Sequence, residues 1–127
     1  MRKNLTITAI LGVITIALGA FGAHALKESL TIAGLNSFET AIRYQFYHII
    51  VLLFVNGYTG FSEQKRKQIS WFFFLGILFF SGSIYLIQLI HVPAKSIWFV
   101  TPLGGLFFMI GWTLMAITFF KKNENVK

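Results

Sequence analysis

Residues 5–26 read LTITAILGVITIALGAFGAHAL, and this apolar stretch without a charged side chain decides the fold. A helix needs about 20 mostly apolar residues to cross the hydrocarbon layer of a membrane, and this stretch is long enough. Working outward, three more uncharged stretches follow at 44–62, 68–94 and 96–120. The sequence therefore predicts an all-α membrane protein, a compact bundle of four transmembrane helices at about residues 5–25, 41–61, 69–90 and 98–120.

The composition supports this class of protein. Of the 127 residues, 56% are hydrophobic and 12% are charged, whereas soluble domains carry about 25% charged residues. The net charge of +7 arises from cations at the ends of the predicted helices, where they contact lipid headgroups. We therefore expect one transmembrane domain over residues 1–127, the lipid bilayer as its surroundings, and no nucleic-acid partner. The absence of cysteine excludes disulfides and cysteine-based metal centres.

The cations are distributed unequally between the two membrane faces that four spans would create. One face receives both termini and the middle loop, with Arg2, Lys3, Lys65, Arg66, Lys67, Lys121, Lys122 and Lys127; the other receives Lys27, Arg43 and Lys95. The positive-inside rule then predicts a multi-pass protein of the inner membrane with both termini in the cytoplasm. A cleaved signal peptide ending at 23–25 is the alternative for the first stretch, although its apolar part exceeds the usual core of about 7–15 residues.

Capping patterns predict where the second helix begins. Asn36 followed three residues later by Glu39 matches a capping box, which predicts a helix from about Ser37 to Gly60. A short surface helix that bends before Tyr44 is the alternative.

The remaining boundaries are predicted from turn and capping residues. Residues 61–68 are predicted to form the cytoplasmic turn. Thr101 is predicted to cap the fourth helix, with Pro102 in its first turn. A kinked helix from Ser96 is the alternative. The tail from Asn123 is predicted to be disordered.

Uncharged polar side chains are concentrated in the outer halves of the predicted helices. Gln45 and His48 share one face of the second helix, and Ser81 and Tyr85 share one face of the third. Because an unpaired polar atom is costly in hydrocarbon, such faces are expected to meet. The predicted polar cluster or ligand pocket comprises His24, Tyr44, Gln45, His48, Ser81, Ser83, Tyr85 and Thr101.

Small residues predict the packing faces of the helices. In the first helix a stripe of threonine and glycine runs from Thr8 to Gly22 at steps of three and four residues. Small side chains let helices approach closely in membranes. The predicted helix-packing residues are Gly12, Gly19, Gly22, Gly82, Gly104, Gly105 and Gly111.

Four motifs run through nearly the whole chain: GAFGAHAL at 19–26, YQFYH at 44–48, FSGSIY at 80–85, and TPLGG with GW within 101–112. Together they resemble the domain of unknown function 423 family, small bacterial inner-membrane proteins related to transmembrane protein 256. The resemblance implies a four-helix membrane protein without an established activity, and an uncleaved first helix.

The residues favour a structural or accessory membrane protein of unknown biochemical function, because the spans carry no deep charged residue of the kind that transporters use. One alternative is an oligomeric transporter or channel for a small solute. Another is metal or haem binding through His24 and His48, although zinc needs at least three protein ligands. No enzyme motif is present, and no cofactor is expected. The expected protein partners are further copies of the chain or another membrane protein.

Overall fold

The computed structural model describes residues 1–124, apart from the side chains of 122–124, and this part of the chain is helical without strands. Four helical segments in it are long and apolar enough to cross a membrane, which confirms the predicted class. The elements are α1 (Arg2–His24), α2 (Ile32–Gly57), α3 (Glu63–Gly76), the π-helical segment η1 (Ile77–Ser81), α4 (Gly82–Leu89), the 3-10 turn η2 (Ala94–Ser96) and α5 (Val100–Glu124). Helices α3 and α4 are joined through η1 into one long rod.

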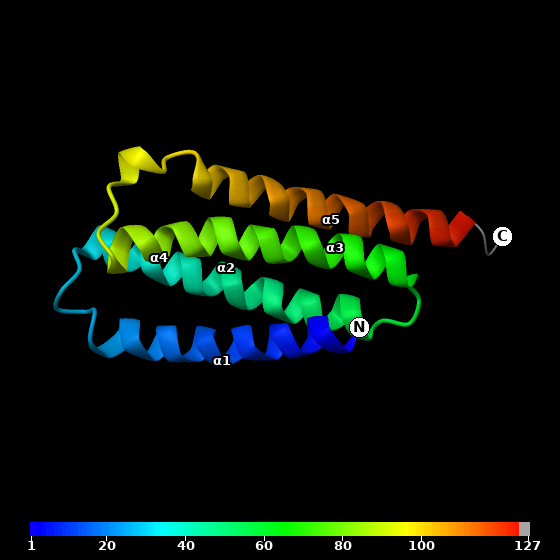
Figure 1. Ribbon diagram of the computed structural model, residues 1–127, viewed down its shortest axis with the longest axis horizontal. Helices are drawn as coiled ribbons and strands as arrows, with labels where there is room; N and C mark the ends of the chain where they lie inside the picture. Colours follow the sequence, from blue (N-terminus) through cyan, green and yellow to red (C-terminus); the bar gives the residue numbers. More distant parts are fainter. Residues whose placement is uncertain (125–127) are drawn as a thin grey trace.

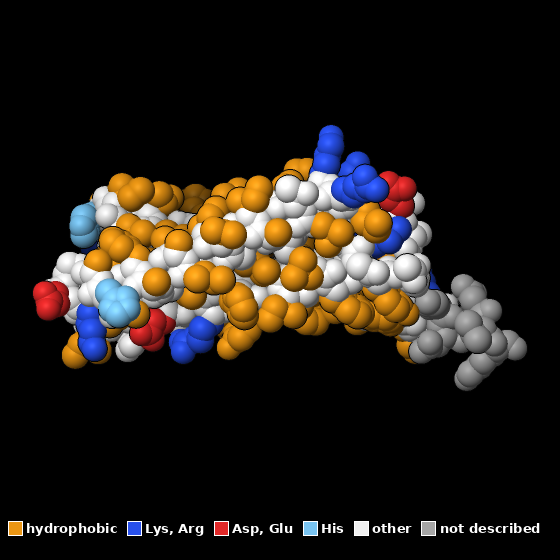
Figure 2. All heavy atoms as spheres, turned by 90° about the horizontal axis from the view of Figure 1, so that it is seen from below, with side chains coloured by type: hydrophobic (Ala, Val, Ile, Leu, Met, Phe, Trp, Pro, Cys, Tyr) orange, Lys and Arg blue, Asp and Glu red, His pale blue; other side chains and the backbone are white. Residues whose placement is uncertain are grey.

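The bundle consists of α1, α2, the α3–η1–α4 rod and α5. These four segments lie side by side, each antiparallel to the one before it in the chain (Figure 1). Helix α1 packs on α2, and the α3–η1–α4 rod packs on both α2 and α5. The start of α1, the α2–α3 loop and the end of α5 lie at one end of the bundle (Figure 1). We call this the basic end and the opposite one the outer end. Hydrophobic side chains cover the middle of the surface, whereas charged side chains gather towards the two ends (Figure 2).

The apolar core lies between α2, the α3–η1 rod and α5. Leu52 and Val55 of α2 meet Ile69 and Phe73 of α3, and Phe108 of α5 closes the cluster. The first helix contributes differently, since its buried residues are Thr8, Thr15 and Gly22. Its large side chains therefore face outward, as expected for a helix surrounded by lipid.

Helix α2 begins at Ile32, so the predicted start near Ser37 is wrong. Thr31 is the N-cap, and its hydroxyl accepts a hydrogen bond from the Gly34 amide at 3.0 Å. Asn36 already lies inside the helix, where its carbonyl accepts from the hydroxyl of Thr40. A threonine hydroxyl satisfies the free amides of a first turn as an asparagine does, and here it does so five residues earlier. The helix ends at Gly57 rather than near Gly60.

Two further boundaries also differ from the prediction. Residues 61–68 are not all turn, because Ser62 caps α3 and the helix starts at Glu63. Thr101 is not a cap but lies inside α5, which begins at Val100 and holds Pro102 in its first turn as predicted. Helix α5 extends to Glu124, past the predicted end at residue 120, and the rest of the predicted disordered tail lies outside the described residues.

Three of the predicted packing glycines touch another helix at distances that leave no room for a side chain. A Cβ atom would overlap the ring of Phe38 at Gly22, the ring of Phe73 at Gly111, and backbone atoms of Phe80 at Gly104. The Phe80 backbone belongs to η1, where one extra residue per turn widens the helix. At Gly104, α5 therefore lies directly against the backbone of the α3–η1–α4 rod.

The other predicted packing glycines are less restricted. A Cβ atom at Gly19 would meet Ile42 at an ordinary 3.8 Å, and one at Gly82 would meet only a carbonyl of its own rod at 4.0 Å. Gly12 and Gly105 have nothing within 4 Å. Gly76, which lies against the ring of Phe108, was not among the predicted packing residues. Of two adjacent glycines at 104 and 105, only the first faces a neighbouring helix.

We predict that Gly104→Ala lowers the free energy of unfolding by about 1–3 kcal/mol, because its Cβ would displace backbone rather than a flexible side chain. Gly105→Ala is the matched control, and it should be neutral or stabilise by about 0.5–1 kcal/mol through helix propensity. The measurement is reversible unfolding in mixed micelles. Equal effects of the two substitutions would contradict the assigned packing face.

Candidate polar site in the outer half of the bundle

Gln45 is the centre of a hydrogen-bonded chain that joins three helices. Its side-chain amide donates to the Thr15 hydroxyl of α1 at 2.7 Å, and its carbonyl oxygen accepts from the Tyr85 hydroxyl of α4 at 2.8 Å. The Thr15 hydroxyl donates in turn to the Leu11 carbonyl at 2.6 Å. Gln45 is only 2% exposed. The amide thus uses both of its polar atoms to tie α1 and α4 to α2.

The serines of the predicted cluster connect the rod to its two neighbours. Ser81 donates to the Ala41 carbonyl of α2 at 2.7 Å. Ser83 and Thr101 share a hydrogen bond of 2.5 Å between α4 and α5, and Ser83 also lies 3.0 Å from the Phe80 carbonyl. Both serines are buried. Since Ser81 faces α2 and Ser83 faces α5, the two form separate contacts and not one pocket.

His48 is held by a partner at each ring nitrogen. Nδ1 lies 2.6 Å from the Tyr44 carbonyl, and Nε2 lies 3.2 Å from the indole nitrogen of Trp112. An indole N–H can only donate, so Nε2 must accept and Nδ1 must carry the hydrogen of the neutral ring. The ring also stacks on Phe108 with centroids 3.6 Å apart and planes at 7°. This geometry assigns His48 as a packed and oriented core residue.

The side chains of His24 and Tyr44 make no hydrogen bond to the other members of the predicted cluster, and His48 faces away from the bonds of Gln45. His24 is exposed at the end of α1. His48 packs against Phe73 and Trp112, on the side of α2 that faces α3 and α5 rather than α1. Tyr44 takes part through its carbonyl, while its half-exposed ring lies on Phe80. The two histidines considered as a metal or haem pair therefore do not face a common space.

The structure adds partners that the sequence pattern did not place in the cluster. Thr15 belongs to the small-residue stripe, and its hydroxyl is the α1 partner of Gln45. Trp112 belongs to the GW motif, and it is the partner of His48. Among the side chains described, those of residues 1–121, no group of three or more histidine, cysteine or acidic residues is arranged to hold a metal ion.

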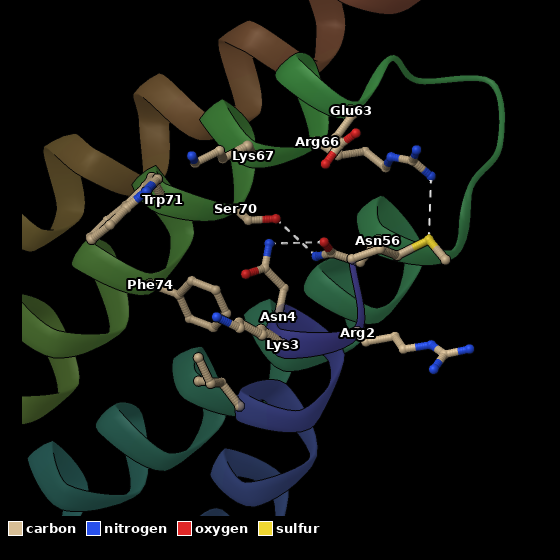
Figure 3. Close-up of a pocket in the computed structure, with 12 residues that line it drawn as sticks. Arg2, Lys3, Asn4, Asn56, Glu63, Arg66, Lys67, Ser70, Trp71 and Phe74 are labelled. Carbon is tan, nitrogen blue, oxygen red and sulfur yellow. Dashed lines mark hydrogen bonds between the residues drawn. The ribbon is translucent and has the colours of Figure 1, made fainter.

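Two cavities in the structure lie away from this cluster. One, of about 250 Å³, lies between α1 and α2 near the outer end and includes Gly19, Phe38 and Arg43 in its lining. The other, of about 740 Å³, lies at the basic end (Figure 3). No residue of the predicted cluster lines either one. The buried members of the cluster thus form contacts between helices and do not line either cavity.

These features define a small polytopic membrane protein with four apolar helices and an internally bonded polar core. The family model described as protein of unknown function, DUF423, matches residues 18–105. The chain belongs to this family, in agreement with the resemblance of its motifs.

Relatives over most of the chain are named as membrane proteins without an assigned activity. The chain is 35% identical to the UPF0382 membrane protein SSP2132 of Staphylococcus saprophyticus, over 95% of this chain and 99% of the relative. It is 37% identical to the UPF0382 inner membrane protein YgdD of Escherichia coli strain K12, over 91% of this chain and 88% of the relative. No solved structure is significantly similar to the chain.

We predict energetic coupling between Gln45 and Tyr85, because one hydrogen bond joins them directly. Gln45→Leu should cost about 1–3 kcal/mol by leaving Thr15 and Tyr85 without this partner. Tyr85→Phe should cost about 0.6–2 kcal/mol, and the double variant should cost less than the sum of the two. The measurement is a double-mutant cycle of unfolding free energies.

Tyr47→Phe is the matched control for this cycle, since Tyr47 lies on the same helix but is 53% exposed. Its effect should simply add to that of Gln45→Leu. Strict additivity for the Gln45 and Tyr85 pair would show that their contact does not stabilise the bundle.

Proposed function

We propose that the chain is a structural or accessory membrane protein of unknown biochemical function, and that its outer-half polar groups serve to hold the helices in register. One observation carries this proposal. Among the described residues, no buried side-chain nitrogen or oxygen lacks a hydrogen-bond partner. Buried polar groups that already have partners cannot bind a ligand without breaking one of these contacts.

The same observation weighs against ligand chemistry in the outer half. A metal or haem iron at His48 would have to displace either the Tyr44 carbonyl or the Trp112 indole from the ring. A solute pathway would have to open the bonds that Gln45 makes to two helices. A protein of this kind acts through its surface, on lipid, on another membrane protein or on further copies of itself.

We predict different outcomes for the two histidines, both unrelated to a bound metal. His24→Ala should change the unfolding free energy by less than about 0.5 kcal/mol, because the side chain is exposed. His48→Ala should cost about 1–3 kcal/mol, because it removes a stacked ring and leaves the Trp112 N–H unpaired. Neither change should alter the metal content or visible spectrum of the purified protein.

The measurements are unfolding in micelles, elemental analysis and absorbance. A stoichiometric metal, or a Soret band that disappears in both variants, would overturn the structural role and favour a metal or haem site.

We further propose that the protein lies in the inner membrane with both termini in the cytoplasm. Support comes from the arrangement of the cations, because the start of α1, the α2–α3 loop and the end of α5 lie at the same end (Figure 1). Arg2, Lys3 and residues 65–67 are among the cations there. Positively charged short loops remain on the cytoplasmic side during insertion. The Escherichia coli relative is named as an inner membrane protein.

We predict that Lys65→Cys reacts with a membrane-impermeant thiol reagent only after the membrane is opened, and that Lys95→Cys reacts in intact cells. Both positions are exposed and outside the uncharged stretches, and the natural chain has no cysteine to interfere. The two single-cysteine proteins control for each other, since the positive-inside rule places them on opposite sides. Reaction of position 65 in intact cells would contradict the proposed orientation.

A further inference from the structure

The cavity of about 740 Å³ at the basic end lies between the first turns of α1 and α3 (Figure 3). Its volume falls within the range of small-molecule sites, about 300–1,000 Å³. Nothing in the structural role of the outer-half cluster uses this cavity. Its lining combines a rigid polar base, an excess of positive charge and an apolar wall.

The polar base of the cavity is fixed by hydrogen bonds from three helices. Asn4 of α1 donates to the side-chain oxygen of Asn56 at 3.1 Å. Asn56 of α2 donates to the Ser70 hydroxyl of α3 at 2.8 Å and to the Leu52 carbonyl at 2.9 Å. Asn56 and Ser70 are each 1% exposed. This network ties α1 and α3 to the same residue of α2 at the base of the opening between them.

Cationic side chains outnumber carboxylates in the lining of the cavity. Its lining includes the cationic side chains of Arg2, Lys3, Arg66 and Lys67, against one carboxylate, that of Glu63. Lys3 and Lys67 lie on two sides of the opening, whereas Arg2 points away from it (Figure 3). The excess of cations over carboxylates in the lining favours an anionic occupant.

The wall becomes apolar with depth along both helices. On α3 the lining passes from Lys67 to Trp71 and Phe74, and seven residues of helix place Phe74 about 10 Å deeper than Lys67. On α1 it passes from Lys3 to Ile7 within about one helical turn. Ile7 and Trp71 are 48% and 58% exposed, so the apolar wall opens sideways to the membrane. The cavity is therefore charged at the membrane surface and apolar towards the hydrocarbon.

We propose that this cavity binds one anionic phospholipid. The phosphate lies between Lys3 and Lys67, and an acyl chain runs along Trp71, Phe74 and Ile7 into the surrounding hydrocarbon. Along its length a phospholipid has a charged headgroup and then apolar acyl chains. Along its depth the cavity has cations and then an apolar wall. A free anion would use the entrance but not the wall, and a neutral lipid would use the wall but not the cations. This proposal rests on the residues of the cavity at the basic end of the bundle. It does not depend on which membrane leaflet that end faces.

Native mass spectrometry of the full chain released from detergent micelles tests this proposal by counting bound lipids. The probes are phosphatidylglycerol, which is anionic, and phosphatidylcholine, which is zwitterionic. We expect one phosphatidylglycerol per chain to bind saturably and in preference to phosphatidylcholine. Each lysine near anionic lipid contributes about 1 kcal/mol, so Lys3→Gln with Lys67→Gln should weaken this binding by about 30-fold.

Lys27→Gln with Lys95→Gln is the matched control, because it removes the same charge from exposed positions at the outer end. This pair should leave phosphatidylglycerol binding unchanged. Ile7→Trp tests the apolar wall separately: it fills the opening from an exposed position, keeps every cation, and should abolish the saturable lipid. Circular dichroism verifies that each variant keeps its helical content.

Inorganic phosphate, added at millimolar concentration in competition, distinguishes a lipid site from an anion site. It should fail to displace phosphatidylglycerol, because it makes no contact with the wall. Displacement by phosphate would overturn the lipid assignment in favour of a free-anion site. Equal binding of the two lipids, or an equal loss in the outer-end control pair, would overturn it in favour of non-specific adsorption.

Discussion

A polar atom in the hydrocarbon of a membrane has no water to bond, and this constraint governs the whole bundle. The backbone meets the constraint by forming helices, and the side chains meet it by bonding across helices. Gln45 does so twice, to Thr15 on α1 and to Tyr85 on α4. The buried residues of α1 are otherwise small, namely Thr8 and Gly22. Helix α1 is therefore docked on α2 by two hydrogen bonds, from Gln45 to Thr15 and from Asn4 to Asn56, and by the close contact of Gly22 with Phe38.

The same constraint is met around the π-helical segment, whose last residue is Ser81. Ser81 donates to the Ala41 carbonyl of α2, while Ser83, two residues later, shares a hydrogen bond with Thr101 of α5. Two residues of helix rotate the side-chain direction by about 200°, so the two serines face opposite neighbours. The close approach of Gly104 to the segment brings α5 near enough for the second bond. The π-helical backbone, Gly104 and the hydroxyl groups of Ser81 and Ser83 thus together hold the rod between α2 and α5.

The class of protein could be predicted because charged residues are absent from the long stretches that cross the membrane. One pairing of the predicted faces is found, since Gln45 of α2 bonds to Tyr85 of α4. The direction in which each side chain points from its helix could not be predicted. Gln45 and His48 lie three residues apart, yet Gln45 bonds to α1 and α4 whereas His48 bonds to Trp112 of α5. The predicted start of α2 was wrong because Thr31 and Asn36 are both good N-cap residues, and the sequence alone does not distinguish between them.

Polar residues inside a membrane protein suggest a functional site. Whether each polar atom already has a hydrogen-bond partner within the protein decides what kind of site they form. In the outer half every described buried polar side-chain atom has a partner, which supports the proposed structural role. At the basic end the base of the cavity, from Asn4 through Asn56 to Ser70, is also complete, but the cations around it outnumber the carboxylate of Glu63. The positive-inside rule explains why cations gather at one end of a bundle. It does not explain why they line a cavity with an apolar wall, and a bound anionic amphiphile does.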